Sequence, residues 1–199
     1  MAERDFERKL SEICSPTLLG EKASGLLSLD ESRFDDLSAL VASYNRRFAD
    51  LGLCFRILRH RKGRGLVLVY RPELLKRSLR NVRIQRLLTH CGYPAGGDLK
   101  ELLAFLSRRL SEDGSFPHEI GAFLDYPPED IEGFIKYRGG CCKYCGCWKV
   151  YGDVESAKAR FACFEECRRL VSGALDRGLS LSELLPGAGI SGTGAHTAA

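Results

Sequence analysis

The sequence predicts an α+β fold, in which a small, mostly antiparallel sheet is packed with several helices. Two apolar runs on either side of the polar, glycine-containing turn 61–64 indicate a β-hairpin at about 52–70. A second β signal is the short run at about 147–151. Apolar residues at helical spacing fill most of the remaining chain. Few strands among many helices, with a hairpin that is local in sequence, are typical of this fold class.

The first 50 residues predict a helix, a strand and a second helix. Helical spacing runs over residues 5–14, and Pro16 is expected to end this helix because the residue before a proline avoids helical geometry. A short strand is expected near residues 25–29. Asp30 or Ser32 then offers an N-cap for a helix that extends to about residue 50.

The chain after the hairpin predicts a succession of helices. Pro72 ends the second strand and suits the first turn of a helix. Helical spacing follows at about 73–79, 81–91, 98–111, 117–124 and 128–136. Asp153 offers an N-cap for a last long helix over about 154–174. We therefore expect one globular domain over residues 1–185, and the small-residue composition of residues 186–199 predicts a disordered tail.

Composition narrows the class of protein and its location. The chain has 199 residues, of which 44% are hydrophobic and 28% charged, which excludes a largely disordered or fibrous protein. No apolar segment approaches the roughly 20 residues needed to cross a membrane, and no signal-peptide run is present. A cytoplasmic location without membrane association is expected. Nine cysteines, an odd number, in a reducing compartment argue against a disulfide framework.

The cysteines carry the densest chemistry, since six of the nine lie between residues 141 and 167. Cys142 and Cys145 have the C-x2-C spacing of a zinc knuckle, and Cys163 and Cys167 stand one helical turn apart on the same face. Four thiolates that converged would hold a zinc ion or an iron–sulfur cluster. This set of four is the predicted metal site, provided that the loop and the last long helix bring the sulfur atoms together.

Two other interpretations of the cysteines stay open. Two thiols would serve as a redox dithiol, or the cysteines are inert and free. Basic residues close to the cysteines in sequence are expected to lower the thiol pKa values, which favours metal or redox chemistry. These basic residues are Lys143, Lys149, Arg160, Arg168 and Arg169.

Positive charge is concentrated in one segment of the chain. Between residues 46 and 90, thirteen Lys or Arg residues stand against two acidic ones, so this segment carries +11 and the rest of the chain −7, for a net charge of +4. A basic stretch over residues 56–86 predicts binding to nucleic acid or another polyanion, whereas a solvated basic face explains it without any partner. The candidate polyanion-binding residues are Arg59, Arg61, Lys62, Arg64, Lys76 and Arg80.

A third hypothesis is an enzyme of unknown reaction that uses His118 and Glu119. The run Phe116–Gly121 places both residues in the first turn of a predicted helix. Glu119 there is also explained by the helix dipole, and His118 by a capping or core hydrogen bond. Alanine at position 122 excludes the zinc-protease pattern H-E-x-x-H.

Four motifs follow one another along the chain. They are Cys14–Lys22 (CSPTLLGEK), Val67–Pro72 (VLVYRP), Phe116–Pro127 (FPHEIGAFLDYP) and Trp148–Asp153 (WKVYGD). Together they resemble a bacterial family, mostly from anaerobes, that is classified only as a domain of unknown function. The resemblance covers about residues 6–170 and implies a single-domain protein, with no activity, substrate or cofactor attached.

The family resemblance also bears on the cysteines. In the family pattern, positions like Cys145 and Cys167 usually hold cysteine, whereas residues 141, 142, 147 and 163 are less regular. This implies a two-thiol function, or a metal site completed by other ligands. The leading functional expectation is therefore cysteine-based metal binding, iron–sulfur binding or thiol redox chemistry, with Cys145 and Cys167 as participants.

Overall fold

The main sheet is a three-stranded antiparallel one. The structure, a computed structural model, describes residues 2–112 and 116–185. Its strands lie in the order β1 (Ser24–Asp30), β3 (Arg64–Tyr70) and β2 (Cys54–Arg61). The predicted hairpin is β2–β3, and it turns at Lys62 and Gly63, whose φ values of 50° and 70° suit a two-residue hairpin loop. The predicted α+β class is confirmed.

Helices surround this sheet within the described residues. Those predicted between residues 73 and 136, and the last long helix, are present, but the helix predicted at 117–124 covers only Ile120–Phe123. His118 and Glu119 therefore precede this helix and do not form its first turn. The helices are α1 (Ala2–Leu18), α2 (Leu37–Arg47), α3 (Pro72–Leu79), α4 (Val82–His90), α5 (Leu99–Ser111), α6 (Ile120–Phe123), α7 (Pro128–Tyr137), α8 (Val154–Asp176) and α9 (Leu181–Leu184), with single 3-10 turns η1 at Glu31–Arg33 and η2 at Ala49–Leu51. The predicted tail at 186–199 lies outside the described residues.

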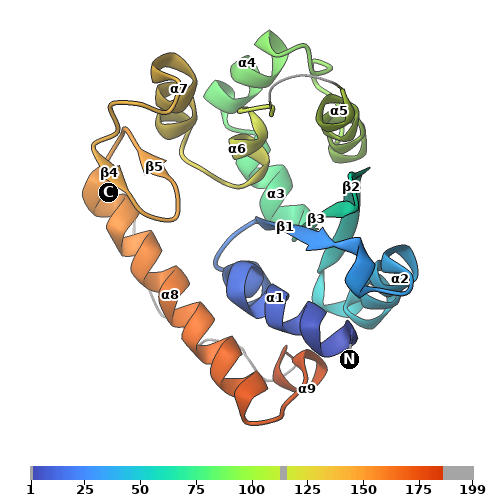
Figure 1. Cartoon of the computed structure of the whole chain (residues 1–199). Coiled ribbons are helices and arrows are strands. Elements are labelled where there is room, and N and C mark those ends of the chain that lie inside the picture. The colour runs from blue at the N-terminus through green and yellow to red at the C-terminus, as the bar shows by residue number, and fades with distance from the viewer. Residues whose placement is uncertain (1, 113–115, 186–199) are drawn as a thin grey trace.

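The sheet is buried on both faces, as the central strand β3 shows. Val67 and Val69 point into a core formed with α1 and α2, whereas Leu66 and Leu68 point into a second core formed with α3 to α6. Figure 1 shows these two helical layers on opposite sides of the sheet. Alternate side chains of a strand point to opposite faces, so an apolar run without polar alternation marks a strand covered twice.

The predicted end of the first helix was wrong. α1 runs through Pro16 to Leu18, because Phe6, Leu10, Cys14 and Leu18 form one apolar stripe that is almost completely buried. Continuing the helix buries Leu18, and the loss of one backbone donor at Pro16 falls in the last turn, where fewer bonds depend on it.

The start of the second helix was also wrong. α2 begins at Leu37, and its N-cap is Asp36, whose carboxylate accepts a hydrogen bond of 2.9 Å from the amide of Ala39. Asp30 caps the short turn η1 instead. Several Asp and Ser residues compete for the capping position here, and the pattern of apolar residues alone does not choose among them.

The strand predicted at 147–151 is present as β5 (Lys149–Val150), but it does not join the main sheet. It pairs with β4 (Tyr144–Cys145) in a separate two-stranded hairpin, and the third strand of the main sheet is β1. A small third core fixes this hairpin on α8: Trp148 and Val150 pack against Ala157 and Phe164. The hairpin therefore depends on α7 and α8 for its position.

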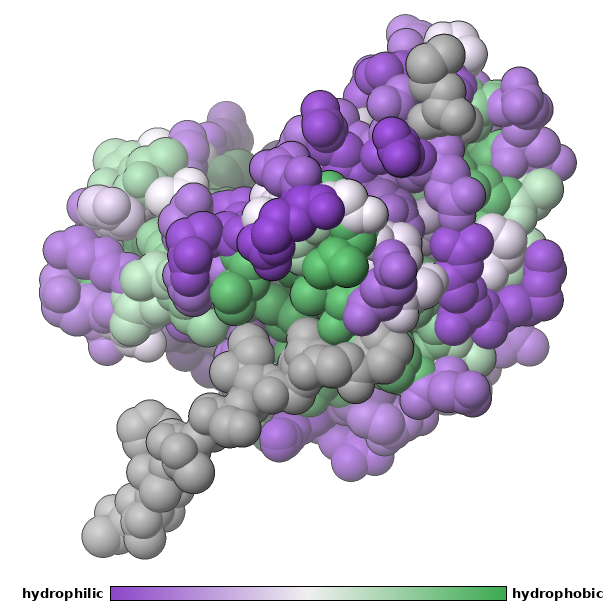
Figure 2. Space-filling model, turned by 90° about the horizontal axis from the view of Figure 1, so that it is seen from below, coloured by the Kyte–Doolittle hydropathy of each residue, from purple (hydrophilic) through white to green (hydrophobic). Residues whose placement is uncertain are grey.

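One face of the molecule carries mainly hydrophilic residues (Figure 2). Figure 2 shows one face, on which hydrophobic residues gather near the middle and hydrophilic ones surround them. Among the described residues, no helix combines the length and apolar character required to cross a membrane.

Candidate functional site

A cavity of about 380 Å³ lies between α6, α7 and the β4–β5 hairpin. We call it the aromatic cavity because its walls include Phe116, Tyr126, Phe134 and Trp148. Its remaining lining residues are His118, Ile120, Gly121, Asp130, Ile131, Cys145, Gly146 and Lys149. Tyr126 stacks on Trp148 with ring centroids 5.1 Å apart, so the two rings form a continuous apolar wall. Predominantly apolar walls with a few polar groups are typical of small-molecule sites.

Asp130 holds the hairpin wall of this cavity in place. Its carboxylate is 3% exposed and accepts hydrogen bonds from the Trp148 indole at 2.6 Å, the Tyr151 amide at 2.7 Å and the Gly152 amide at 2.8 Å. Buried carboxylates are stable only when such donors satisfy them. Asp130 is therefore occupied by the protein itself and serves to position Trp148.

Three other polar side chains remain for a ligand in the aromatic cavity. His118 is exposed and lies edge-on to Phe134, with ring centroids 5.0 Å apart. Lys149 donates one hydrogen bond of 2.6 Å to the carbonyl of Gly139, which leaves two ammonium donors. Cys145 contributes an exposed thiol from β4. Two nitrogen-bearing groups and a thiol thus face an otherwise apolar space.

The predicted catalytic residues His118 and Glu119 point into different surroundings. Glu119 is 4% exposed and is bound by Arg109 at 3.2 Å and by the Tyr93 hydroxyl at 3.5 Å. This places Glu119 in the second core rather than in the aromatic cavity. Of the pair, only His118 lines that cavity.

The four predicted metal ligands are divided between two places. Cys145 lines the aromatic cavity, and Cys142 interacts electrostatically with Tyr151, whereas Cys163 and Cys167 lie one helical turn apart on α8 and interact with each other. Across residues 2–112 and 116–185, no group of three or more His, Cys, Asp or Glu side chains is arranged to hold a metal ion.

The expectation that basic neighbours lower the thiol pKa values was wrong for the two cysteines of α8. Burial raises the pKa of Cys167 to about 12, and it also raises the pKa of Cys163, with further increases from nearby Glu21. Cys163 lies 3.6 Å from a carboxylate oxygen of Glu21. Removal from water disfavours the thiolate more than distant cations favour it.

A different cysteine, Cys147, lies beside cations. It is exposed and lies near the guanidinium of Arg168, which itself pairs with Glu165. Lys22 lies close enough to interact electrostatically with Cys147, and its ammonium sits over the rings of Tyr126 and Phe164 at 5.1 and 5.6 Å. Burial lowers the pKa of Lys22. Cys147 and Lys22 were not among the predicted site residues.

The predicted polyanion-binding residues form two groups. Arg59, Arg61, Lys62 and Arg64 surround a hollow of about 280 Å³ at the tip of the β2–β3 hairpin. Part of this charge has a structural use: Arg59 donates to the carbonyl of Leu110 at 3.0 Å, and Arg64 binds the hydroxyl and carbonyl of Ser28.

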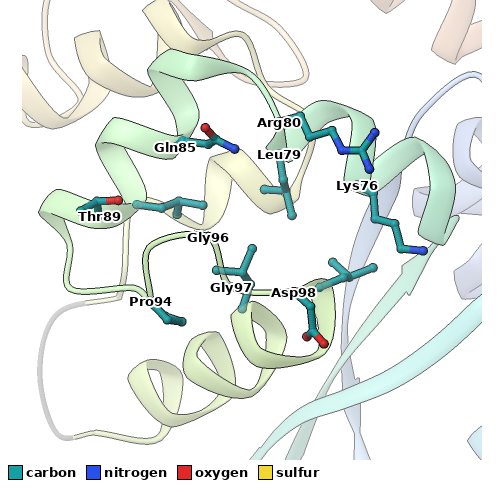
Figure 3. A pocket seen from close by; sticks show the side chains of 12 residues that line it. Lys76, Leu79, Arg80, Gln85, Thr89, Pro94, Gly96, Gly97 and Asp98 are labelled. Carbon is teal, nitrogen blue, oxygen red and sulfur yellow. The ribbon is translucent and has the colours of Figure 1, made fainter.

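Lys76 and Arg80 belong to a second hollow, formed by α3, α4 and the start of α5. This cavity of about 340 Å³ has a floor of Leu79, Leu88, Leu99 and Leu102, and we call it the leucine cavity (Figure 3). Its rim consists of Lys76, Arg80, Gln85, Thr89, Pro94, Gly96, Gly97 and Asp98. The six candidate polyanion-binding residues are therefore divided between two separate hollows.

Comparison with known proteins identifies the family. A model for a protein family of unknown function, DUF3793, matches residues 10–185. The chain belongs to the DUF3793 family. No curated protein and no solved structure matches this DUF3793 protein. The match spans all the elements that form the aromatic and leucine cavities, and it brings no activity with it.

The sequence did not predict the aromatic cavity of this DUF3793 protein, although most of the residues that line it lie in the motifs at 116–127 and 148–153. Trp148 both packs in the protein, through the hydrogen bond of its indole nitrogen to Asp130, and lines the cavity. Phe134 and Tyr126 carry no recognisable spacing relative to Trp148. A signal that was available is the clustering of aromatic residues in the two motifs around residues 116–127 and 148–153.

Proposed function

We propose that this protein binds a small aromatic carboxylate in the aromatic cavity. The observation that carries the proposal is the combination of four aromatic side chains with the two nitrogen groups of His118 and Lys149 at one cavity. Aromatic walls favour a flat apolar ligand, and an ammonium with free donors favours a negatively charged group on it. The carboxylate of Asp130 repels a negatively charged ligand only weakly, because three hydrogen-bond donors of the protein already satisfy it.

The only tryptophan of the chain, Trp148, reports directly on this cavity. Titration with phenylacetate is expected to change the tryptophan fluorescence in a saturable manner. The neutral analogue phenylacetamide is expected to bind about tenfold more weakly, because it loses the charge-assisted hydrogen bond to Lys149. If neither phenylacetate, benzoate nor other aromatic carboxylates of similar size change the tryptophan fluorescence in a saturable manner, the proposal is contradicted.

Two lysines of the same hairpin provide a matched pair of variants. Lys149 lines the aromatic cavity, whereas Lys143 donates in the same way to a glycine carbonyl, that of Gly152 at 2.9 Å, but does not line it. Lys149→Met is expected to remove the preference for phenylacetate over phenylacetamide. Lys143→Met is expected to keep it, which separates ligand binding from a general loss of hairpin charge.

Thiol chemistry is a second candidate, favoured by the position of Cys147. The thiol of Cys147 is exposed near Arg168 and Lys22, so it is accessible to oxidants and to other thiols. A zinc ion or iron–sulfur cluster on Cys142, Cys145, Cys163 and Cys167 remains a prediction. Metal analysis and the visible absorption spectrum of protein purified without oxygen test it, and the reactivity of each cysteine tests the redox alternative.

An anionic partner at the hairpin tip is supported by the four cations around the hollow near Ser28. Affinity for double-stranded DNA that falls steeply with salt, and that decreases in an Arg61→Gln and Lys62→Gln double variant, is the expected result. Salt-independent or absent binding would leave the basic tip as a solvated surface.

A further inference from the structure

The leucine cavity offers charges of both signs above an apolar floor. Lys76 and Arg80 come from α3, Gln85 and Thr89 from α4, and Asp98 from the start of α5 (Figure 3). Leu79 and Leu88 are 6% and 3% exposed, so the floor belongs to the second core and is rigid. The rim side chains are exposed. Such an arrangement suits a small molecule with an apolar part and charged groups of both signs.

The two cations of this cavity, Lys76 and Arg80, are not fully neutralised by acidic side chains of the protein. Within the described residues, Arg80 forms no ion pair within 4.0 Å, and Lys76 pairs only with Glu73 of its own helix, at 2.7 Å. The Lys76–Glu73 pair is exposed, and exposed pairs of this kind contribute little free energy. Both side chains are therefore free to bind a carboxylate, for which a guanidinium provides two parallel donors.

The anionic side is Asp98, which is the N-cap of α5. Its Oδ1 accepts a hydrogen bond of 2.8 Å from the Glu101 amide, and its own amide donates to Glu101 at 2.9 Å. This capping box fixes the position of the carboxylate and leaves Oδ2 available. No basic side chain lies within 4.0 Å of Asp98 in the part of the chain that the structure describes, so its charge favours a cationic group on a ligand.

The part of the rim that precedes Asp98 is bare backbone (Figure 3). Gly96 has a φ of 70°, a left-handed conformation that favours glycine, and an added Cβ there would meet nothing within 4 Å. At Gly97 a Cβ would come within 2.9 Å of the Pro94 ring. Gly96 thus permits the left-handed turn, and Gly97 permits the close approach of the loop to the Pro94 ring.

We propose that the leucine cavity binds a free amino acid with an apolar side chain. The α-carboxylate binds Arg80 and Lys76, the α-ammonium binds Asp98, and the side chain packs on the four leucines. An amino acid carries these three features on one small molecule, whereas a simple anion would leave Asp98 as a repulsive neighbour. This site is separate from the aromatic cavity, with which it shares no lining residue.

Calorimetric titration of the full chain with L-leucine, L-isoleucine, L-phenylalanine and L-methionine tests the proposal. At least one of the four is expected to bind. For that amino acid, the N-acetyl derivative lacks the ammonium and the amide derivative lacks the carboxylate, and each is expected to bind about tenfold more weakly. No binding by any of the four, or equal affinity for the amino acid and both derivatives, would overturn the proposal.

Two variants assign the charges. Asp98→Asn keeps a good N-cap and removes the charge, so the fold is retained while the penalty for N-acetylation disappears. Arg80→Gln is expected to remove most of the preference for the carboxylate over the amide. Arg77→Gln, on the same helix but outside this cavity, is the control and is expected to behave like the wild type. If Arg80→Gln and Asp98→Asn both retain the wild-type preferences, the amino acid binds elsewhere and the assignment is wrong.

Discussion

The six clustered cysteines lie in two regions, the segment 141–147 that leads into the β4–β5 hairpin and helix α8, and the two regions differ in how far they expose the thiols. In the hairpin segment, Cys141, Cys145 and Cys147 are exposed, whereas Cys167 on α8 is 2% exposed and packs as a small apolar residue. Cysteine density alone therefore does not identify a common site. Burial, which the sequence expresses only through helical periodicity, separates reactive thiols from structural ones.

The largest expected difference between the two regions is in thiol reactivity. Burial raises the pKa of Cys167 from its ordinary value of 9.0 to about 12, so its thiolate fraction near neutral pH falls by about a thousandfold. With iodoacetamide at pH 8, Cys145 and Cys147 are expected to react within minutes in the folded protein, and Cys167 only on unfolding. Peptide mapping by mass spectrometry over a time course measures each rate. Rapid labelling of Cys167 in the folded state would show that α8 opens readily.

The same shift has a consequence for stability at alkaline pH. A pKa that is raised in the folded state means that the folded protein holds its proton more tightly than the unfolded chain does. The contribution of Cys167 to stability is therefore fully present below pH 9 and is lost as the pH rises toward 12.

The hairpin, in contrast, depends on one buried carboxylate of α7. Asp130→Ala would leave the Trp148 indole and the amides of Tyr151 and Gly152 without their acceptor, and the expected loss is about 3 kcal/mol or more in the free energy of unfolding. Glu132→Ala on the same helix breaks only an exposed pair with Arg83 and is expected to cost less than about 1 kcal/mol. Urea denaturation of both variants measures the difference. Equal losses would mean that Asp130 does not pin the hairpin.

On α8 the comparison can be made between two cysteines one turn apart. Cys167→Ser places a hydroxyl in an apolar core and is expected to reduce stability by about 1–3 kcal/mol. Cys163→Ser, at a half-buried position near Glu21, is expected to change it by no more than about 0.5 kcal/mol. Thermal unfolding of the two variants under reducing conditions provides the measurement. A larger loss at Cys163 would indicate that its contact with Glu21 matters more than the burial of Cys167.

The sequence was sufficient for those features that depend on local patterns. The β2–β3 hairpin follows from two apolar runs and the Lys62–Gly63 turn, and the helices between residues 73 and 136 follow from their periodicity. The partner of the strand at 147–151 did not follow, because β4 is only two residues long and carries no alternation that could mark it. Pairing of such short strands is decided by what they pack on, here α7 and α8.

The candidate sites were predictable only in part, for a related reason. His118 and Cys145 were named from their motifs, and both line the aromatic cavity. The cavity itself results from the way in which α7 and the hairpin meet, and Asp130, which joins them, was not distinguished from the other acidic residues at the start of a helix. Its burial depends on contacts between segments 18 to 22 residues apart.

The smallest expected effect on the fold, and the one that best separates folding from binding, is at His118. The imidazole is exposed and contacts Phe134 edge-on, so His118→Ala is expected to change stability by no more than about 0.5 kcal/mol. If His118 contributes one hydrogen bond to the carboxylate of a bound ligand, the same variant weakens phenylacetate binding by about three- to tenfold. His90→Ala, another exposed histidine at the end of α4, serves as the control and should leave the affinity unchanged. An unchanged affinity in His118→Ala, alongside a clear loss in Lys149→Met, would assign the ligand's charge to Lys149 alone and confine His118 to the apolar wall.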